Sequence, residues 1–233
     1  MNRTKRKTKP SSRRGVVVYE GPSMIGDRSP IVAILTWHSA NRKTGDLAQL
    51  WILPATQSPL DAVKANNNRG ACGDCILQGR NLDGRQIGRT CYVNLGQAPN
   101  RIYGTTYPDA GDLRPVPVRF GAWGEPTTVP FDVLESLTAN GHTGYTHQWR
   151  TCDIRYQDIL MASVDSPEEK AEAEALGWRT FRPRKPGEPL LAGEIQCPAT
   201  EAGGNKVQCD RCLLCSGNTR KGAKSISEYE LRG

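Results

Sequence analysis

The chain has 233 residues, of which 37% are hydrophobic, with 24 glycines, 16 prolines and a net charge of +7. This length suffices for one sizeable domain or two small ones, with a core that needs no disulfides. No apolar run reaches the roughly 18 residues of a membrane helix, and no apolar segment follows the charged start, so neither a membrane protein nor a secretory signal is expected.

All of the excess charge lies in residues 1–14. This segment carries seven Lys/Arg and no acid; removing these seven from the 31 basic residues leaves 24, which equals the 24 acidic residues. A charged segment without apolar periodicity is expected to be disordered. It has two open interpretations, which are nucleic-acid binding by counterion release and a solubilising extension.

Short β-rich runs open the folded part of the chain. The first three predicted strands cover 15–21, 31–37 and 46–53. Ser58 and Pro59 then have the residue types of an N-cap and a first helical position, so a helix is predicted over 58–65. Residues 69–90 are expected to form a loop. Ordered structure is expected to begin again at 91–96, and residues 97–115 are expected to be irregular.

Strands and helices alternate in the second half of the chain. The predicted strands cover 117–124, 143–149, 159–165 and 178–183. The predicted helices cover 130–141 and 166–177, the second capped by Ser166. Because strand–helix–strand alternation at this spacing is typical of parallel βαβ units, we expect a parallel sheet. A last edge strand is predicted at 225–231.

These elements predict an α/β protein. The expected architecture is a partial (β/α)-barrel-like parallel sheet with a β-rich N-terminal portion and a Cys-rich C-terminal metal-binding segment. The predicted organisation is a disordered basic tail at 1–14, a barrel-like domain with a central Cys loop at 15–194, and a Cys-rich segment with a C-terminal tail at 195–233.

Seven of the eight cysteines fall into two compact sets. The first set is Cys72, Cys75 and Cys91, and the second is Cys197, Cys209, Cys212 and Cys215. In a reducing cytoplasm, cysteines at such spacing are expected to bind metal. A C-x2-C-x2-C run with a distant Cys-Pro is typical of cubane iron–sulfur sites, so the second set predicts a [4Fe–4S] cluster. Zinc held by four thiolates is the alternative.

The first set has only three cysteines. If it holds a cubane cluster, one iron is left open to bind a substrate or cosubstrate. The alternative is a closed site, in which Cys152, His142 or His147 supplies a fourth ligand. No catalytic residue is assigned, because the chain has no P-loop, no H-E-x-x-H and no Ser-His-Asp order.

The glycine-rich segment GAWGEP (121–126) lies at the end of a predicted strand and is followed by a predicted helix. It resembles the Gly-Gly-Glu-Pro segment of radical S-adenosylmethionine enzymes, which contacts the methionine ammonium. The resemblance implies that Glu125 anchors this cosubstrate and that Gly124 and Pro126 shape the turn. The chain departs from the family in its cluster loop, which is C-x2-C-x15-C here and C-x3-C-x2-C in that family.

The cysteine order over about 70–215 also resembles the gene product 88-like family of small phage-encoded proteins of unknown function. This resemblance implies a partial (β/α) barrel in a phage or mobile-element protein of the host cytoplasm, and it implies no activity. The cysteine sets add the expectation of one or two [4Fe–4S] clusters, and the resemblance to radical S-adenosylmethionine enzymes implies a reaction of S-adenosylmethionine at the three-cysteine set. The alternative is a non-catalytic, zinc-stabilised protein that binds nucleic acid through its basic tail.

Overall fold

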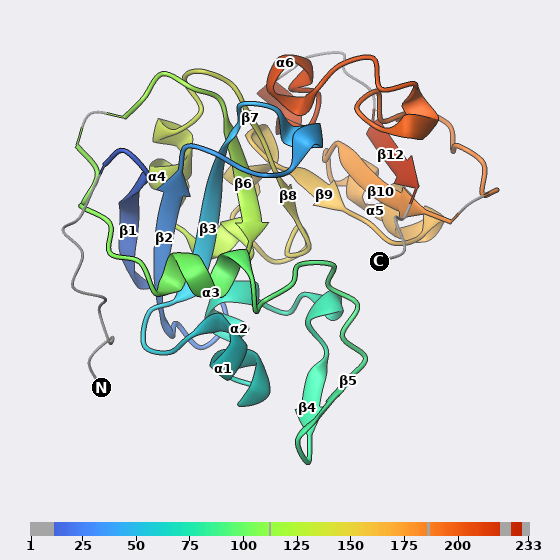
Figure 1. Ribbon diagram of the computed structural model, residues 1–233. Helices are drawn as coiled ribbons and strands as arrows, with labels where there is room; N and C mark the ends of the chain where they lie inside the picture. The colour runs from blue at the N-terminus through green and yellow to red at the C-terminus, as the bar shows by residue number, and fades with distance from the viewer. Residues whose placement is uncertain (1–11, 112, 186, 220–224, 230–233) are drawn as a thin grey trace. The chain divides into compact units, whose positions relative to one another are not determined.

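The computed structural model describes residues 12–111, 113–185, 187–219 and 225–229, which form two compact units (Figure 1). The first unit contains the described residues of 1–38, 49–114 and 121–134. The second unit contains those of 39–48, 115–120 and 135–233. Most of the predicted basic tail lies outside the described residues.

The first sheet has five strands in the order β1-β2-β3-β6-β7. They are β1 (Gly15–Pro22), β2 (Pro30–Thr36), β3 (Ala48–Pro54), β6 (Val118–Trp123) and β7 (His142–Thr143). β2 pairs antiparallel with β1 and with β3, whereas β6 and β7 are parallel. β2 pairs on both sides, and every one of its residues after Pro30 is buried, so both faces of the sheet are covered along this strand. The predicted strands at 15–21, 31–37, 46–53 and 117–124 are confirmed.

Short helices and one hairpin complete the first unit. They are α1 (Pro59–Lys64), α2 (Arg69–Cys72), β4 (Arg80–Leu82), β5 (Arg85–Ile87), α3 (Ala98–Tyr103) and the start of α4 (Phe131–Ser136). Ser58 caps α1 as predicted, since its hydroxyl accepts from the Asp61 N–H at 3.1 Å.

Two sequence expectations for the first unit are wrong. Residues 69–90 are not a loop, because they form α2 and the β4–β5 hairpin. Asp83 and Gly84 have φ values of 49° and 79°, the conformation of a type I′ hairpin turn, and this Asp-Gly pair is the signal that would have predicted it. Residues 97–115 are not irregular throughout, because α3 lies within them.

The second sheet is parallel throughout, with the order β11-β12-β10-β9-β8. Its strands are β8 (Tyr145–Thr146), β9 (Met161–Ser163), β10 (Thr180–Arg184), β11 (Glu194–Gln196) and β12 (Ser225–Tyr229). With α5 (Pro167–Ala175), β9 and β10 form the predicted βαβ unit. β12 was expected at an edge, which is wrong, because it pairs with β10 on one side and β11 on the other.

Seven short helical segments link these strands and helices. They are η1 (Arg42–Thr44), η2 (Ile76–Gln78), η3 (Pro126–Thr128), η4 (Ile154–Asp158), η5 (Glu201–Gly203), α6 (Cys209–Cys212) and η6 (Gly217–Thr219).

The mixed α/β class is confirmed. The described strands form two five-stranded sheets and a hairpin and close no barrel, so the partial-barrel expectation stays a prediction. In the part of the chain that the structure describes, no helix has the length and apolar character needed to span a membrane.

The strand predicted at 143–149 is interrupted at Gly144, with β7 before it and β8 after it. A Cβ at this position would lie 2.5 Å from Leu160 Cδ2 and 2.9 Å from Phe120 Cβ. The chain therefore passes from one sheet to the other at a residue that has no room for a side chain.

We expect Gly144→Ala to lower the free energy of unfolding by about 1–3 kcal/mol, because the added methyl overpacks a filled site. Urea unfolding measures this change. Gly111→Ala is the matched control, since a Cβ there meets nothing within 4 Å. Equal unfolding midpoints for the two variants would contradict the overpacking.

Candidate metal centres

Cys72 is the last residue of α2 and is buried, with 8% of its surface exposed. The Asn68 carbonyl accepts from the Cys72 N–H at 2.9 Å. The Asn68 side chain hydrogen-bonds the Cys72 sulfur and also donates to Gln78 Oε1 at 2.8 Å. These contacts fix Cys72 against the segment that follows Cys75.

The 15-residue gap before Cys91 contains the β4–β5 hairpin, which belongs to the same unit. The Leu77 carbonyl accepts from the Thr90 N–H at 3.1 Å and from the Cys91 N–H at 2.9 Å. These two hydrogen bonds join the two chain segments at the base of the β4–β5 hairpin. Cys91 is therefore brought back to the segment of Cys75, although the sequence separates them widely.

The three cysteines and Glu125 share one electrostatic neighbourhood. The pKa of the Cys72 thiol is raised to about 12, chiefly by burial; the hydrogen bond from Asn68 lowers it, and the charges of Cys75, Cys91 and Glu125 contribute to the rise. Buried thiols of this kind ionise readily only beside a cation, because each thiolate opposes the ionisation of the next.

The GAWGEP segment packs directly on α2. The Glu125 N–H donates to the Ala71 carbonyl at 2.7 Å. At Gly124, where φ is +94°, a Cβ would lie 2.4 Å from the Ile52 carbonyl oxygen and 3.1 Å from that of Ala71. Glycine is therefore required at 124 by close packing of backbone on backbone.

The Glu125 carboxylate is 4% exposed and caps η3. Its Oε1 accepts from the Thr127 N–H at 3.3 Å and from the Thr127 hydroxyl at 3.1 Å. Pro126 is the first residue of η3 and packs against Gly121. The three residues expected from the resemblance to hold a cosubstrate thus also have a structural role at the end of β6.

The proposed fourth ligands of the first set lie in the other unit. Cys152, His142 and His147 belong to the second unit, whereas Cys72 and its partners belong to the first. His142 stacks on Phe120 with ring centroids 5.3 Å apart, and burial lowers its pKa. The open and closed forms of the first site both stay predictions.

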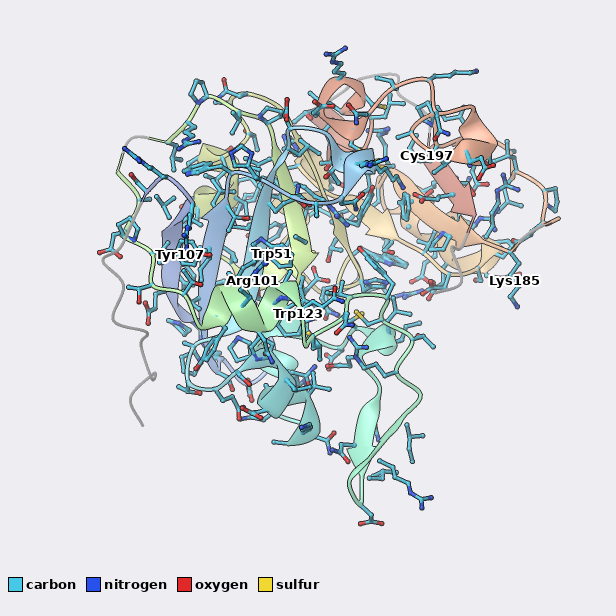
Figure 2. All side chains as sticks on the ribbon, viewed as in Figure 1. Trp51, Arg101, Tyr107, Trp123, Lys185 and Cys197 are labelled. Atoms are coloured by element: carbon cyan, nitrogen blue, oxygen red, sulfur yellow. The ribbon has the colours of Figure 1, made fainter. Side chains whose placement is uncertain are left out.

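The second cysteine set lies wholly in the second unit (Figure 2 labels Cys197). The Cys197 N–H donates to the Ser227 carbonyl of β12 at 2.8 Å. Cys209 and Cys212 begin and end α6, and Leu213 in the left-handed conformation stops that helix. The Cys215 carbonyl accepts from the Gly144 N–H at 2.9 Å.

Two residues far away in sequence also reach this set. Lys43 forms an ion pair with Glu228 and acts electrostatically on Cys197 and Cys209. Burial lowers the pKa of Lys43, but the Glu228 carboxylate and these two thiols outweigh burial and raise it. Tyr145 hydrogen-bonds Cys215 through its hydroxyl, and burial raises the Tyr145 pKa well above its usual value.

The four thiols act on one another. Burial raises the pKa of Cys215 to about 12 and that of Cys209 to about 11. Burial also raises the Cys197 pKa, while Lys43 opposes the rise. The charges of Cys197, Cys209 and Cys212 each contribute to the shift of Cys215. Because these thiols oppose one another's ionisation, ionisation of all four would need a nearby cation to balance the charge.

In the described part of the chain, no group of three or more His, Cys, Asp or Glu side chains is arranged to hold a metal ion. The donor chemistry nevertheless fits a soft metal. All eight cysteines lie among the described residues and none forms a disulfide. Both sets consist of sulfur donors, the ligands preferred by iron–sulfur clusters and by structural zinc.

Sequence reasoning identified the seven cysteines but missed Asn68, Lys43 and Tyr145. Asn68 precedes Cys72 by four residues, which is one helical turn, so a contact between this polar side chain and Cys72 could have been predicted from the sequence. Lys43 and Tyr145 lie far from the second set in sequence, and no local pattern points to them.

Comparison of the chain with models of protein families, with curated proteins and with solved structures gives no match in any of the three. The family resemblances stated above therefore stay predictions.

We expect Gly124→Ala to lower the free energy of unfolding by about 2 kcal/mol or more, because the methyl separates β6 from α2. Urea unfolding measures the loss, and modification of Cys72 by a thiol reagent in the metal-free protein becomes faster. Gly84→Ala is the control, since Gly84 has a similar φ of +79° and nothing within 4 Å of an added Cβ. Equal effects of the two substitutions would show that backbone strain alone matters.

Proposed function

We propose that this chain is an iron–sulfur protein with one thiolate-ligated site in each unit. The observation that supports this most is that the thiols of each set act electrostatically on a buried cysteine, which is Cys72 in the first set and Cys215 in the second. In the first unit the group is Cys72, Cys75 and Cys91. In the second unit it is Cys197, Cys209, Cys212 and Cys215. A reducing cytoplasm belongs to this proposal, because the thiols must stay reduced.

The second site is proposed as a closed [4Fe–4S] cluster. Its four thiolates would occupy every iron, which suits a structural or electron-relay role. Lys43 and the Tyr145 hydroxyl stand beside these sulfurs. A neighbouring cation and a hydrogen bond to sulfur both stabilise the negative charge of such a cluster and raise its reduction potential.

The first site is proposed as the reactive one. Three thiolates leave one metal position open, and the Glu125 carboxylate lies within electrostatic reach of Cys72. Carboxylates hold ammonium groups through charge-assisted hydrogen bonds, so Glu125 is suited to anchor the amino group of S-adenosylmethionine. When bound there, an open cluster supplies the electron for reductive cleavage of that cosubstrate. Gly124 and Pro126 place Glu125 at the end of β6.

Anaerobically purified protein is expected to be brown, with absorbance near ~400 nm and about four irons and four sulfides per cluster. Cys91→Ser should remove the first cluster only, and Cys209→Ser the second only. Cys152→Ser is the matched control, because Cys152 belongs to neither set, and it should keep both. A colourless protein with stoichiometric zinc and no iron would replace this proposal by the zinc-stabilised alternative.

We expect the iron-loaded protein to bind S-adenosylmethionine in anaerobic calorimetry, and Glu125→Gln to weaken this binding about tenfold, because a charged hydrogen bond is lost. Glutamine keeps an oxygen for the two Thr127 contacts. Glu135→Gln, at an exposed position on α4, is the control and should bind as the wild type does. Absence of binding by an iron-loaded wild type would remove the cosubstrate from the proposal and leave the clusters.

A further inference from the structure

The β4–β5 arm, defined here as residues 79–90, presents one unusual face. In the antiparallel register Arg80 lies opposite Ile87 and Leu82 opposite Arg85. Residues directly opposite each other share a face, as do residues two apart on one strand. Arg80, Leu82, Arg85 and Ile87 therefore all project from the same side of the arm.

The other face is held to the unit through Asn81. The Asn81 side-chain N–H₂ donates to the Lys64 carbonyl at 2.7 Å, and the Asn81 backbone N–H donates to Asn66 Oδ1 at 2.6 Å. The Asn66 side chain donates back to the Asn81 carbonyl at 2.7 Å. These three bonds hold the arm through Asn81, which lies on the face opposite to the two arginines. Figure 1 shows the β4–β5 hairpin extending away from the strands of the first sheet.

This arrangement inverts the usual pattern of a hairpin that packs on a protein body, in which aliphatic side chains face inward. Here the inward position is an asparagine, whereas Leu82 is 53% exposed and Ile87 is 51% exposed. Arg80 and Arg85 are exposed beside them. Aliphatic side chains presented to water on a fixed scaffold indicate a surface that a partner covers.

Exposed apolar side chains also occur beside the cysteines at the two ends of the arm. Ile76 directly follows Cys75 and is 68% exposed, and Tyr92 directly follows Cys91 and is 72% exposed. Among the described residues nine large hydrophobic side chains are exposed, and four of these nine fall between 76 and 92. Exposed hydrophobic side chains are thus concentrated in a strip of sequence that comprises the arm and the residues next to Cys75 and Cys91.

The chemistry of the strip indicates an anionic, aromatic occupant. The arm face carries two guanidinium groups and no carboxylate, since Asp83 lies in the turn. A nucleotide chain alternates an anionic phosphate with an apolar, stackable base. Arginines bind the former, while aliphatic side chains and an exposed tyrosine ring bind the latter. An acidic polypeptide would match only the arginines, whereas a nucleotide chain matches the arginines and also the exposed aliphatic and aromatic side chains beside them.

We propose that the outer face of the β4–β5 arm, together with Tyr92, binds single-stranded nucleic acid and leads it to the three-cysteine set. As a statement about the substrate class of that set, this inference rests on the proposed function. As a binding surface, it stands on the arm alone. It is also distinct from the basic segment at 1–14, most of which lies outside the described residues.

The test uses the full chain and a fluorescein-labelled 20-nucleotide oligo-dT in fluorescence anisotropy. We expect the double variant Arg80→Ala/Arg85→Ala to bind about tenfold more weakly, and the slope of log K against log salt to become shallower by about 1.4, since two phosphate contacts are lost. Tyr92→Ala should weaken binding about tenfold through lost stacking, while Tyr92→Phe keeps the wild-type affinity.

The control is Arg101→Ala/Lys185→Ala, which removes the same charge from two exposed residues outside the arm (Figure 2) and keeps the N-terminal segment. It should bind within twofold of the wild type. Equal affinities for the arm variant and this control would overturn the inference and assign any binding to other basic residues. Tighter binding of a 20-base-pair duplex, or equal competition by polyglutamate, would overturn it as well.

Iron and sulfide are counted in the same samples. Arm variants that lose oligonucleotide binding while they keep iron support the inference. An iron-free wild type whose binding still depends on Arg80 and Arg85 supports the binding surface and rejects only the proposed function. An iron-loaded wild type that does not bind the oligonucleotide rejects only the arm.

Discussion

The hydrogen bond from the Glu125 N–H to the Ala71 carbonyl, 2.7 Å long, is the contact on which the first site depends. It joins the end of β6 to α2, and α2 ends at Cys72. The bond forms only because Gly124 has no side chain between the two backbones. A single close approach of backbone to backbone thus positions the most buried thiol of the first set and brings the Glu125 carboxylate near it.

The two cysteine sets are built by different means. The first is made from one continuous stretch of chain, which the β4–β5 arm leaves and re-enters between Cys75 and Cys91. The second needs three separate segments, since η1 brings Lys43 to the loop at Cys197 and to α6. Asp210 Oδ2 accepts from the Asp46 N–H at 3.1 Å and helps to hold η1 against α6. The first set therefore depends on contacts within one stretch of chain, and the second on contacts between segments far apart in sequence.

The arm links both proposals. Its base is closed by the Leu77 carbonyl, which accepts hydrogen bonds from the Thr90 and Cys91 N–H groups. The hairpin that exposes Leu82 and Ile87 therefore also brings Cys91 back to the segment of Cys75. An irregular loop of the same length would bring Cys91 back to Cys75 at a similar cost in conformational entropy, because the entropy of loop closure depends only weakly on length. The hairpin adds a fixed face, and a fixed face is what a binding surface requires.

Local sequence by itself determined the β-rich start, the Ser58 and Ser166 helix caps, the β9–α5–β10 unit and the grouping of seven cysteines, because caps, periodicity and short spacings act over a few residues. Only the tertiary structure decided the position of β12 between β10 and β11, the return of Cys91, and the approach of Lys43 and Tyr145 to the second set. Those outcomes depend on pairing and packing between segments tens of residues apart, which no local pattern encodes.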